Sequence, residues 1–572
     1  MPRAGTSQVA SNGRGLPWTA ALPFSLLCLA LNAVVWAGVA LNRPSYLRDY
    51  RLGANPDARH YVLLGRNLLL VGHYSRCERP PYAPDIVRTP VYPLFAGVFD
   101  IVGNAAAIYL AQAVLQAGSC LLLFLLVRPL FGGGAALWAS VLLGTDLMLA
   151  VSNFEAMSEP LFLFLLLASC VCLLPVLIAV GEEEGPAWPR PLLGGALLGL
   201  AILTRPAALY LPLVFAVACL ALGIARGRRT AALRTTVLLV ASALFPAGLW
   251  VARNESVFSV PRLTTIDVNN MVYFVGAGAY QVRHHASLEE AQSMISREFG
   301  LPPYVVLQNH WTAGQSIAEL DAELHGARWR VLRKYPRELV VSSVQGIVKA
   351  GFSHNVGTLA ELWGRSWIPP QTGALLRLRS SAFDRLLQNG PPLSAAFAWQ
   401  LLHVVISLIT GLVGAALALK DPRTRTAGLI LGVVLVYFSL TTALFGLEAY
   451  CRCRIPVLPF LYAFAGCGLA QLAGPRRPAP ADPDTGPPHC RRLGDAPMWA
   501  VRQYLGGAPE VMVALPLQGP PLAERIPEGD ARAGVHREGE GATAAPSDSP
   551  RVGASVSVSP AGRPRAGGRS ES

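Results

Sequence analysis

The sequence predicts an all-α polytopic membrane protein with about ten transmembrane helices, interfacial helices, a smaller extracytoplasmic mixed domain and a disordered C-terminal tail. The first observation is composition: 52% of the 572 residues are hydrophobic and only 15% are charged, whereas about a quarter of an ordinary soluble domain is charged. The second is a series of apolar runs, most of them near the ~20 residues that a helix needs to cross a bilayer. They cover residues 17–41, 104–127, 133–153, 158–180, 191–204, 206–225, 232–252, 395–419, 427–447 and 455–473.

The segments around these runs predict an orientation. The first run follows Arg3 and Arg14 and is longer than the roughly 7–15 apolar residues of a signal peptide, so we expect a membrane anchor with a cytoplasmic N-terminus. The loops 226–234 and 420–426 carry four and three basic residues. Both loops are then cytoplasmic, as the positive-inside rule requires. The break at Arg205 leaves two alternatives for 191–225, namely two spans or one kinked element.

This orientation divides the chain into five parts. The large outer segment contains a helix-like stretch from Gln315 to Arg333 that ends before Pro336. The last part is rich in Pro, Gly, Ala, Ser and Arg, which predicts a disordered cytoplasmic tail. The parts are a cytoplasmic N-terminus (1–16), a transmembrane core (17–252) with its first extracytoplasmic loop (42–103), an extracytoplasmic domain (253–394), the C-terminal transmembrane helices (395–473) and the tail (474–572).

The net charge of +13 does not predict a nucleic-acid partner, because many arginines lie in short loops between apolar runs and suit membrane topology. The ten cysteines include no zinc-type spacing. A disulfide between Cys77 and Cys451 or Cys453 is conceivable outside the membrane. Since the chain also lacks an acidic cluster that would demand a cation, we expect no cofactor and no essential metal.

Charged side chains gather at one end of the predicted spans. Charges inside a bilayer are costly and therefore informative. The outer ends of the spans carry Glu155, Glu159, Arg205, Arg452 and Arg454, and Asp57 also lies outside. A transporter more often places its polar site near the midplane, so this pattern favours an interfacial enzyme that faces outward. Asp146 is the exception within a span, and we expect it to hydrogen-bond a neighbouring helix.

The first outer loop contains a predicted interfacial helix. Residues 61–71 have apolar side chains at helical spacing, with Arg66 and Asn67 between them. Asp57 stands just before this helix, where a carboxylate can cap the N-terminus. Taken alone, capping is the simpler role for Asp57. A catalytic role gains weight only from the surrounding motifs.

Motifs in a fixed order resemble the type C glycosyltransferases, in the branch of the protein O-mannosyltransferases and the lipid A aminoarabinose transferase. The resemblance covers about 40–255 and 445–470. In the first outer loop it lies in Asp57, Tyr61, GRNLL (65–69), GHYS (72–75) and RTPVYPLF (88–95). Further along it lies in SEPLFLFLLL (158–167), GLAILTRPAALYL (199–211), WVARN (250–254) and EAYCRCRIPVLP (448–459).

The resemblance implies an integral membrane glycosyltransferase of a bacterial inner membrane. Such an enzyme moves a hexose or pentose from a polyprenyl-phosphate carrier to an extracytoplasmic acceptor, such as a protein, lipid A or a cell-envelope glycan. Asp57 matches the catalytic aspartate as a candidate general base, and Glu159 matches the second acidic position, where Glu155 could substitute. Arg452 and Arg454 match the residues expected to bind the carrier phosphate. Arg88 and Arg205 are weaker candidates for the same contact, and His60 and Tyr61 could line the pocket.

Alternatives remain open at this stage. Arg452 and Arg454 could simply reach from a helix end to the interface, and Arg205 could only terminate a span. At the level of function, the chain could instead transport a lipid-linked glycan, or serve as a non-catalytic assembly protein whose outer domain binds a partner.

Overall fold

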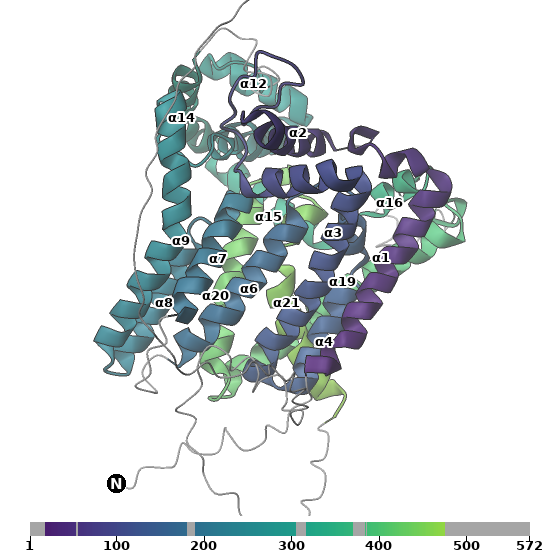
Figure 1. Cartoon of the computed structure of the whole chain (residues 1–572), viewed down its shortest axis with the longest axis vertical. Coiled ribbons are helices and arrows are strands. Elements are labelled where there is room, and N and C mark those ends of the chain that lie inside the picture. Colours follow the sequence, from purple (N-terminus) through teal and green to yellow (C-terminus); the bar gives the residue numbers. More distant parts are fainter. Residues whose placement is uncertain are drawn as a thin grey trace, which may run out of the picture. The chain divides into compact units, whose positions relative to one another are not determined.

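A computed structural model describes residues 18–52, 55–179, 189–304, 316–369, 384 and 386–474 (Figure 1). Within these ranges the chain forms helices and no β-strand, apart from one isolated bridge between Ser75 and Pro84. The predicted all-α polytopic fold is confirmed. The expected mixed composition of the extracytoplasmic domain is wrong for its described residues, which are helical. The predicted cytoplasmic N-terminus (1–16) and disordered tail (474–572) lie outside the described residues, except for Gly474.

Each of the ten apolar runs contains a helix. Seven helices in the described ranges are long and apolar enough to cross a membrane, with the short turn η4 (Pro206–Ala208) adjoining one of them. They are α1 (Leu22–Asn42), α3 (Val91–Phe131), α6 (Glu159–Ile178), α8 (Leu211–Ala225), α9 (Arg229–Phe258), α19 (Pro391–Lys420) and α20 (Arg425–Ala443). Three shorter apolar helices complete the set, namely α4 (Gly133–Gly144), α7 (Pro189–Thr204) and α21 (Leu458–Leu472). The region 191–225 is thus two helices that meet at Arg205.

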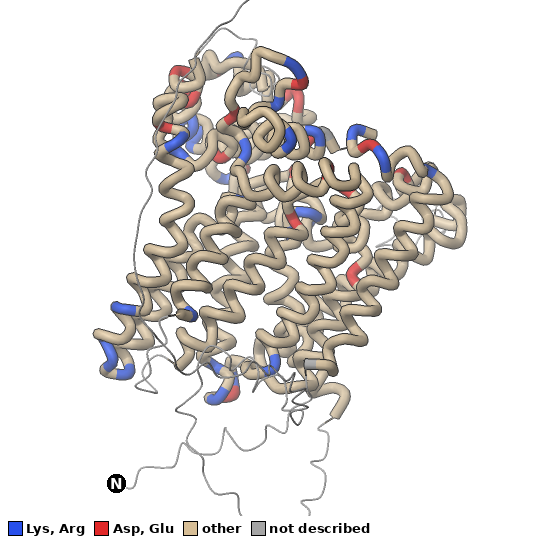
Figure 2. Tube along the Cα trace, in the orientation of Figure 1, with Lys and Arg blue, Asp and Glu red and all other residues tan. Residues whose placement is uncertain are grey.

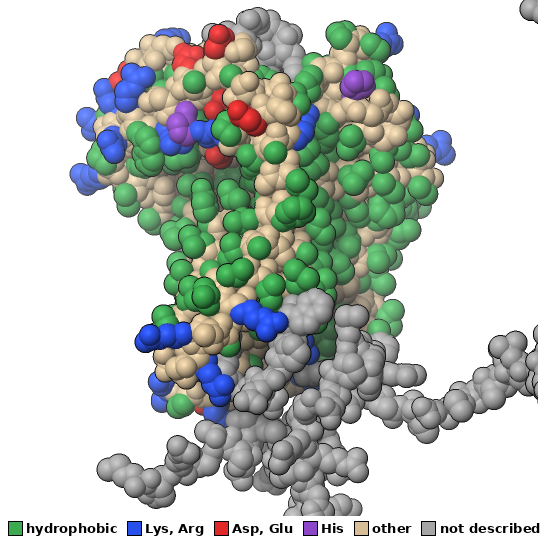
Figure 3. All heavy atoms as spheres, turned by 60° about the vertical axis from the view of Figure 1, so that its left-hand side comes forward, with side chains coloured by type: hydrophobic (Ala, Val, Ile, Leu, Met, Phe, Trp, Pro, Cys, Tyr) green, Lys and Arg blue, Asp and Glu red, His purple; other side chains and the backbone are tan. Residues whose placement is uncertain are grey.

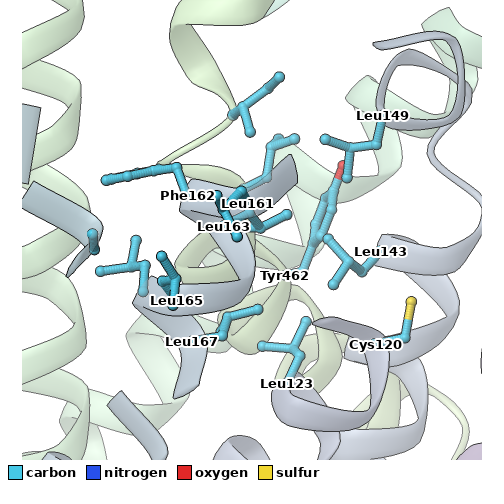
Figure 4. Packing of buried hydrophobic residues seen from close by; sticks show 14 of the residues in the cluster. Cys120, Leu123, Leu143, Leu149, Leu161, Phe162, Leu163, Leu165, Leu167 and Tyr462 are labelled. Carbon is cyan, nitrogen blue, oxygen red and sulfur yellow. The ribbon is translucent and has the colours of Figure 1, made fainter. Parts of the chain in front are cut away.

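Glycines allow α21 to pack closely against two neighbours. A Cβ atom on Gly466 would overlap the Ala135 carbonyl of α4, and one on Gly468 would overlap the Thr410 carbonyl of α19. Small residues at such contacts let helix backbones approach in a membrane, where van der Waals packing has to replace the hydrophobic effect. Around this contact, side chains from α3, α4, α6 and α21 meet in a buried apolar core (Figure 4).

Charged residues lie mainly at the two ends of the helix bundle (Figure 2). Between those ends the visible surface is largely apolar (Figure 3). This distribution matches a protein whose middle layer faces lipid, and it makes the few charged groups just inside one end stand out.

The helix α2 (Pro56–Val71) packs on the first part of α3. A Cβ atom on Gly65 would overlap the Pro93 carbonyl, and one on Gly97 would contact the backbone of Gly65. The α3 helix itself is broken, because Gly103 (φ −158°, ψ 27°) and Asn104 (φ 61°, ψ −159°) are not helical. The part before the break lies crosswise to the long part after it (Figure 1).

Residues 266–335 of the predicted extracytoplasmic segment share a core of their own, whereas residues 356–362 contribute to the core of the helix bundle. The core contains Val268, Tyr273, Ile295 and Val331. The predicted helix within it is confirmed as α14, which begins after the N-cap Ser316 and ends before Pro336. The helices are α10 (Ile266–Asn270), the π-helix η5 (Met271–Gly276), α11 (Ala277–His284), α12 (Leu288–Phe299), α14 (Ile317–Lys334), α15 (Pro336–Phe352) and α16 (Val356–Leu362).

Candidate active site

The first part of the site is an ion pair between α2 and the segment that precedes α3. Asp57 Oδ1 lies 2.5 Å from Arg88 Nη2. Arg88 Nη1 donates a hydrogen bond to the Tyr61 hydroxyl (3.2 Å), and its guanidinium lies 4.9 Å from the centre of the Tyr61 ring. Asn55 provides the N-cap of α2, because its side chain accepts a hydrogen bond from the Asp57 amide. The expected capping by Asp57 is therefore wrong, and its carboxylate is available for Arg88.

The position of Arg88 is fixed by a scaffold that motif reasoning missed. Asp85 Oδ1 accepts hydrogen bonds from the amides of Val87 (2.8 Å) and Arg88 (3.0 Å). Thr264 Oγ1 donates to the Val87 carbonyl (2.6 Å), and Arg253 Nη1 donates to the Asp85 carbonyl (2.7 Å). Asp85 is completely buried. A buried carboxylate that accepts two backbone amides is a rigid support, so these residues hold the loop in which Arg88 stands.

The second part of the site is centred on Glu159, the first residue of α6. Its Oε1 atom lies 2.6 Å from Arg205 Nη1 and 2.7 Å from Arg452 Nη2, and it accepts a further hydrogen bond from Arg452 Nε (2.8 Å). Arg205 lies between α7 and η4, and Arg452 belongs to the short helix η8 (Cys451–Arg454). The structure thus brings together three predicted site residues that are far apart in the chain.

Electrostatics join the two parts. Burial raises the pKa of Asp57, but the opposing charges of Arg88 and then Arg452 outweigh burial and hold this pKa below its usual range. Asp57 is consequently ionised at neutral pH. Because a carboxylate of low pKa accepts protons poorly, the ion pair favours a positioning role for Asp57. Its predicted role as general base stays a prediction.

Glu155 lies in the loop between α5 (Leu147–Ser152) and α6 and is 8% exposed. Unlike Asp57 and Glu159, it forms no ion pair with any other described residue. Burial is the main cause that raises its pKa to about 7, against the opposing charge of Arg452 and with the added repulsion of Glu159.

The remaining site candidates have different surroundings. Burial, and then the charges of Arg76 and Arg88, lower the pKa of His60 to about 4, so this imidazole is neutral at pH 7. Arg454 Nη1 donates to three carbonyls at the end of α15, those of Ala350, Gly351 and Ser353. Its Nε and Nη2 atoms are buried and have no hydrogen-bond partner among the described residues. Its expected contact with phosphate therefore stays a prediction.

Other sequence-based expectations concern residues away from this cluster. Asp146 caps α5 and accepts hydrogen bonds from Tyr462 of α21 (2.5 Å) and Gln400 of α19 (3.4 Å), as expected for a contact between helices. The nine cysteines in the described ranges are free, so the conceivable disulfide of Cys77 is not formed in this structure. The described residues include no group of three or more His, Cys, Asp or Glu side chains that could hold a metal ion.

Comparison with known proteins finds one match to a family model. The family model for dolichyl-phosphate-mannose-protein mannosyltransferases matches residues 87–250. That range includes Arg88, Glu159 and Arg205, whereas Asp57 and Arg452 lie outside it. The match and the helical membrane fold confirm the resemblance to the type C polytopic membrane glycosyltransferases.

Two solved structures are similar to this chain at low identity. The archaeal oligosaccharyltransferase AglB from Archaeoglobus fulgidus, in complex with an inhibitory peptide and a dolichol-phosphate, is 14% identical with a TM-score of 0.42 over 77% of this chain and 50% of that chain. ArnT from Cupriavidus metallidurans, bound to undecaprenyl phosphate, is 16% identical with a TM-score of 0.31 over 78% of both chains. This chain therefore spans about half the length of the archaeal enzyme. No curated protein matches the sequence.

Proposed function

We propose that this protein transfers a sugar from a polyprenyl-phosphate carrier to an acceptor on the extracytoplasmic side of the membrane. The observation that carries the proposal is the cluster of Arg88, Arg205 and Arg452 around Asp57 and Glu159 at one end of the helix bundle. While Glu155 is protonated, the three guanidinium groups and the two carboxylates leave one positive charge, and ionisation of Glu155 cancels it. Charged side chains within a membrane protein are costly and mark functional sites, and these guanidinium groups suit the negative charge of a sugar phosphodiester.

Unused hydrogen-bonding atoms in the cluster support a polar ligand. Arg88 Nε and Glu159 Oε2 are buried and have no hydrogen-bond partner among the described residues. Buried polar atoms normally find partners, so we assign Arg88 Nε to a phosphate oxygen and Glu159 Oε2 to a hydroxyl of the substrate. Arginine suits phosphate because its planar fork matches two oxygen atoms.

The proposed reaction needs these groups for charge that develops during transfer. As the acceptor hydroxyl attacks the anomeric carbon, the bond from that carbon to the phosphate oxygen breaks, and its electron pair stays on the phosphate. Arg88 and Arg452 would stabilise this charge, which is the step at which fixed cationic donors contribute most. A carboxylate has to take the proton of the hydroxyl.

The finer assignments belong to the same proposal. The carrier bears a hexose or a pentose, the acceptor is a protein, lipid A or a cell-envelope glycan, and the site faces outward from a bacterial inner membrane. A glycan transporter is less well supported, because the buried Asp146 is engaged by Tyr462 and Gln400 and leaves no free carboxylate there for a substrate.

The test measures transfer by the purified full-length chain in lipid nanodiscs. The donors are polyprenyl phosphates that carry a radiolabelled hexose or pentose, and membrane fractions provide the acceptors. We expect transfer with at least one donor and a fall in turnover of about 10²- to 10³-fold in Arg88→Gln, as for loss of a donor to a developing anion. Arg59→Gln is the matched control, because Arg59 lies on the same α2 helix but pairs with Glu78 at the surface.

Three results would contradict the proposal. Transfer by Arg88→Gln at the rate of the Arg59→Gln control would remove Arg88 from the site. In proteoliposomes, movement of intact donor across the membrane without release of polyprenyl phosphate would identify a transporter. Absence of turnover with every donor would favour a non-catalytic assembly protein.

A further inference from the structure

We infer that Glu155 is the catalytic base that takes the proton from the acceptor hydroxyl, whereas Asp57 and Glu159 position the arginines. This inference rests on the proposed function and names the residue that completes its chemistry. It reassigns the role that the motif order gave to Asp57.

The ion pairs provide the first argument. Asp57 shares its Oδ1 atom with Arg88 at 2.5 Å, and Glu159 shares its Oε1 atom with two guanidinium groups. A carboxylate that is bound to a cation is stabilised in its charged form, and this lowers its affinity for a proton. Glu155 is the carboxylate of the cluster that forms no ion pair with another described residue, so it can accept a proton without breaking a salt bridge.

The second argument is the construction of the loop that carries Glu155. The side-chain amide of Gln112 in α3 donates hydrogen bonds to the backbone carbonyls of Asn153 (2.8 Å) and Glu155 (2.9 Å). Its Oε1 atom accepts a hydrogen bond from the Tyr92 hydroxyl (2.7 Å). The Tyr46 hydroxyl donates to the carbonyl of the intervening Phe154 (2.7 Å). Three successive carbonyls are thus fixed by buried side chains.

The same network continues into the bundle. Asn153 Nδ2 donates to Asn32 Oδ1 of α1 (2.8 Å) and to Gln116 Oε1 of α3 (2.5 Å). Asn32, Gln112, Gln116 and Asn153 are all at most 3% exposed. Buried polar networks are costly unless every member is satisfied. This network holds the backbone of Glu155, four residues before Glu159, in one position.

The surroundings also suit a proton acceptor at neutral pH. Burial and nearby anions raise the pKa of Glu155 to about 7, the range in which a general base works best. Arg452 of η8 opposes this effect, whereas Glu159 of α6, Glu361 of α16 and Asp57 of α2 reinforce it. The other titratable groups that interact with Glu155 are the hydroxyls of Tyr46, Tyr92, Tyr109 and Tyr450 and the thiol of Cys451.

The proton balance of the reaction agrees with this assignment. A sugar phosphodiester with one negative charge becomes a phosphate monoester that gains a second charge, and the acceptor hydroxyl loses one proton. The proton moves to Glu155 as the new glycosidic bond forms and the bond to phosphate breaks. Glu155 becomes neutral at the same time, so the charge of the pocket does not change. The carboxylic acid then returns its proton to water.

The experiment is the pH dependence of turnover in the full-length protein. For the wild type we expect kcat to rise with pH up to a plateau above about 7, because Glu155 has to be ionised. Glu155→Gln should lose about 10²- to 10⁴-fold in kcat and should also lose this rise. Its Kd for polyprenyl phosphate should stay within about threefold of the wild-type value, which shows that the folded site persists. Glu155→Asp should recover part of the activity together with the rise.

Two further variants decide between the carboxylates. Asp57→Asn should keep the rise with pH while it weakens binding of polyprenyl phosphate, because it releases Arg88. Glu78→Gln, at an exposed surface pair, should behave as wild type. The inference is overturned if Glu155→Gln keeps the rise, or if Asp57→Asn abolishes it. If the wild type transfers no sugar from any donor, the proposed function fails and this inference fails with it. If the wild type transfers sugar and Glu155→Gln shows the same dependence of kcat on pH, only the inference fails.

Discussion

The buried pairing of Glu159 with two arginines leads to a strong prediction for Glu159→Gln. The carboxylate is 2% exposed, and the side chains of Arg205 and Arg452 are 20% and 11% exposed. Removing one partner of a buried ion pair typically costs about 3–5 kcal/mol, because a charge is left without compensation. The glutamine carbonyl can still accept a hydrogen bond from a guanidinium, which is worth about 1.5 kcal/mol or more. We therefore expect Glu159→Gln to lower the free energy of unfolding by about 1.5–3.5 kcal/mol.

Thermal unfolding of the purified protein in one detergent, supported by denaturant titration, measures this loss. The matched control is Glu298→Gln, which breaks a pair with Lys334 whose two side chains are 34% and 44% exposed and should cost less than about 1 kcal/mol. Combining Glu159→Gln with Arg205→Gln should cost less than the two single changes together, because it removes the unpaired charge. If Glu159→Gln unfolds at the temperature of the control, the cluster is solvated and this account of its energetics is wrong.

Two further predictions concern packing and pH. Gly65→Ala should push α2 away from the Pro93 carbonyl and lower the free energy of unfolding by about 1–3 kcal/mol, which a lower unfolding temperature would show. The control is Gly326→Ala on α14, where a Cβ atom meets open space, and it should be neutral or stabilising. Equal effects of the two changes would refute the tight contact at Gly65. The pKa of Glu155 rises on folding from 4.5 to about 7, so ionising it costs the folded state up to about 3 kcal/mol. That cost is absent below pH 4.5 and complete above about pH 7. Glu155→Gln should therefore unfold at a higher temperature than the wild type at pH 8 and at nearly the same temperature at pH 5, and a constant difference across this range would contradict the shifted pKa.

Much of the architecture follows from hydropathy alone. Each apolar run contains a helix because a spanning backbone has to satisfy its hydrogen bonds internally. The break at Arg205 follows from the proline after it, since proline disfavours a helical conformation in the preceding residue. Motif order also gathered Arg88, Glu159 and Arg452 as one set. It did not show that Glu159 binds both Arg205 and Arg452, because the rotation and depth of each helix depend on packing between elements that are distant in the chain.

Other features depend on local geometry that residue type does not reveal. Asp57 and Asn55 are both good N-caps, and only the backbone selects Asn55. Arg452 and Arg454 are two residues apart, yet one faces Glu159 and the other the end of α15. The network that holds the loop of Glu155 had a detectable signal, since Gln112 and Gln116 stand four residues apart within an apolar run. That spacing places both amides on one face of a helix.

The break in α3 gives the chain a crosswise segment directly after the loop that carries Arg88. At 1.5 Å per residue, an unbroken helix of 41 residues would extend about 60 Å, twice the hydrocarbon thickness of a bilayer. The break leaves a crosswise segment with exposed apolar side chains at Val98, Ile101 and Val102. We expect such a segment to lie at the boundary between lipid and water. Since Arg88 lies directly before this segment, its guanidinium would then lie at the level of the lipid headgroups, which is also the level of a carrier phosphate.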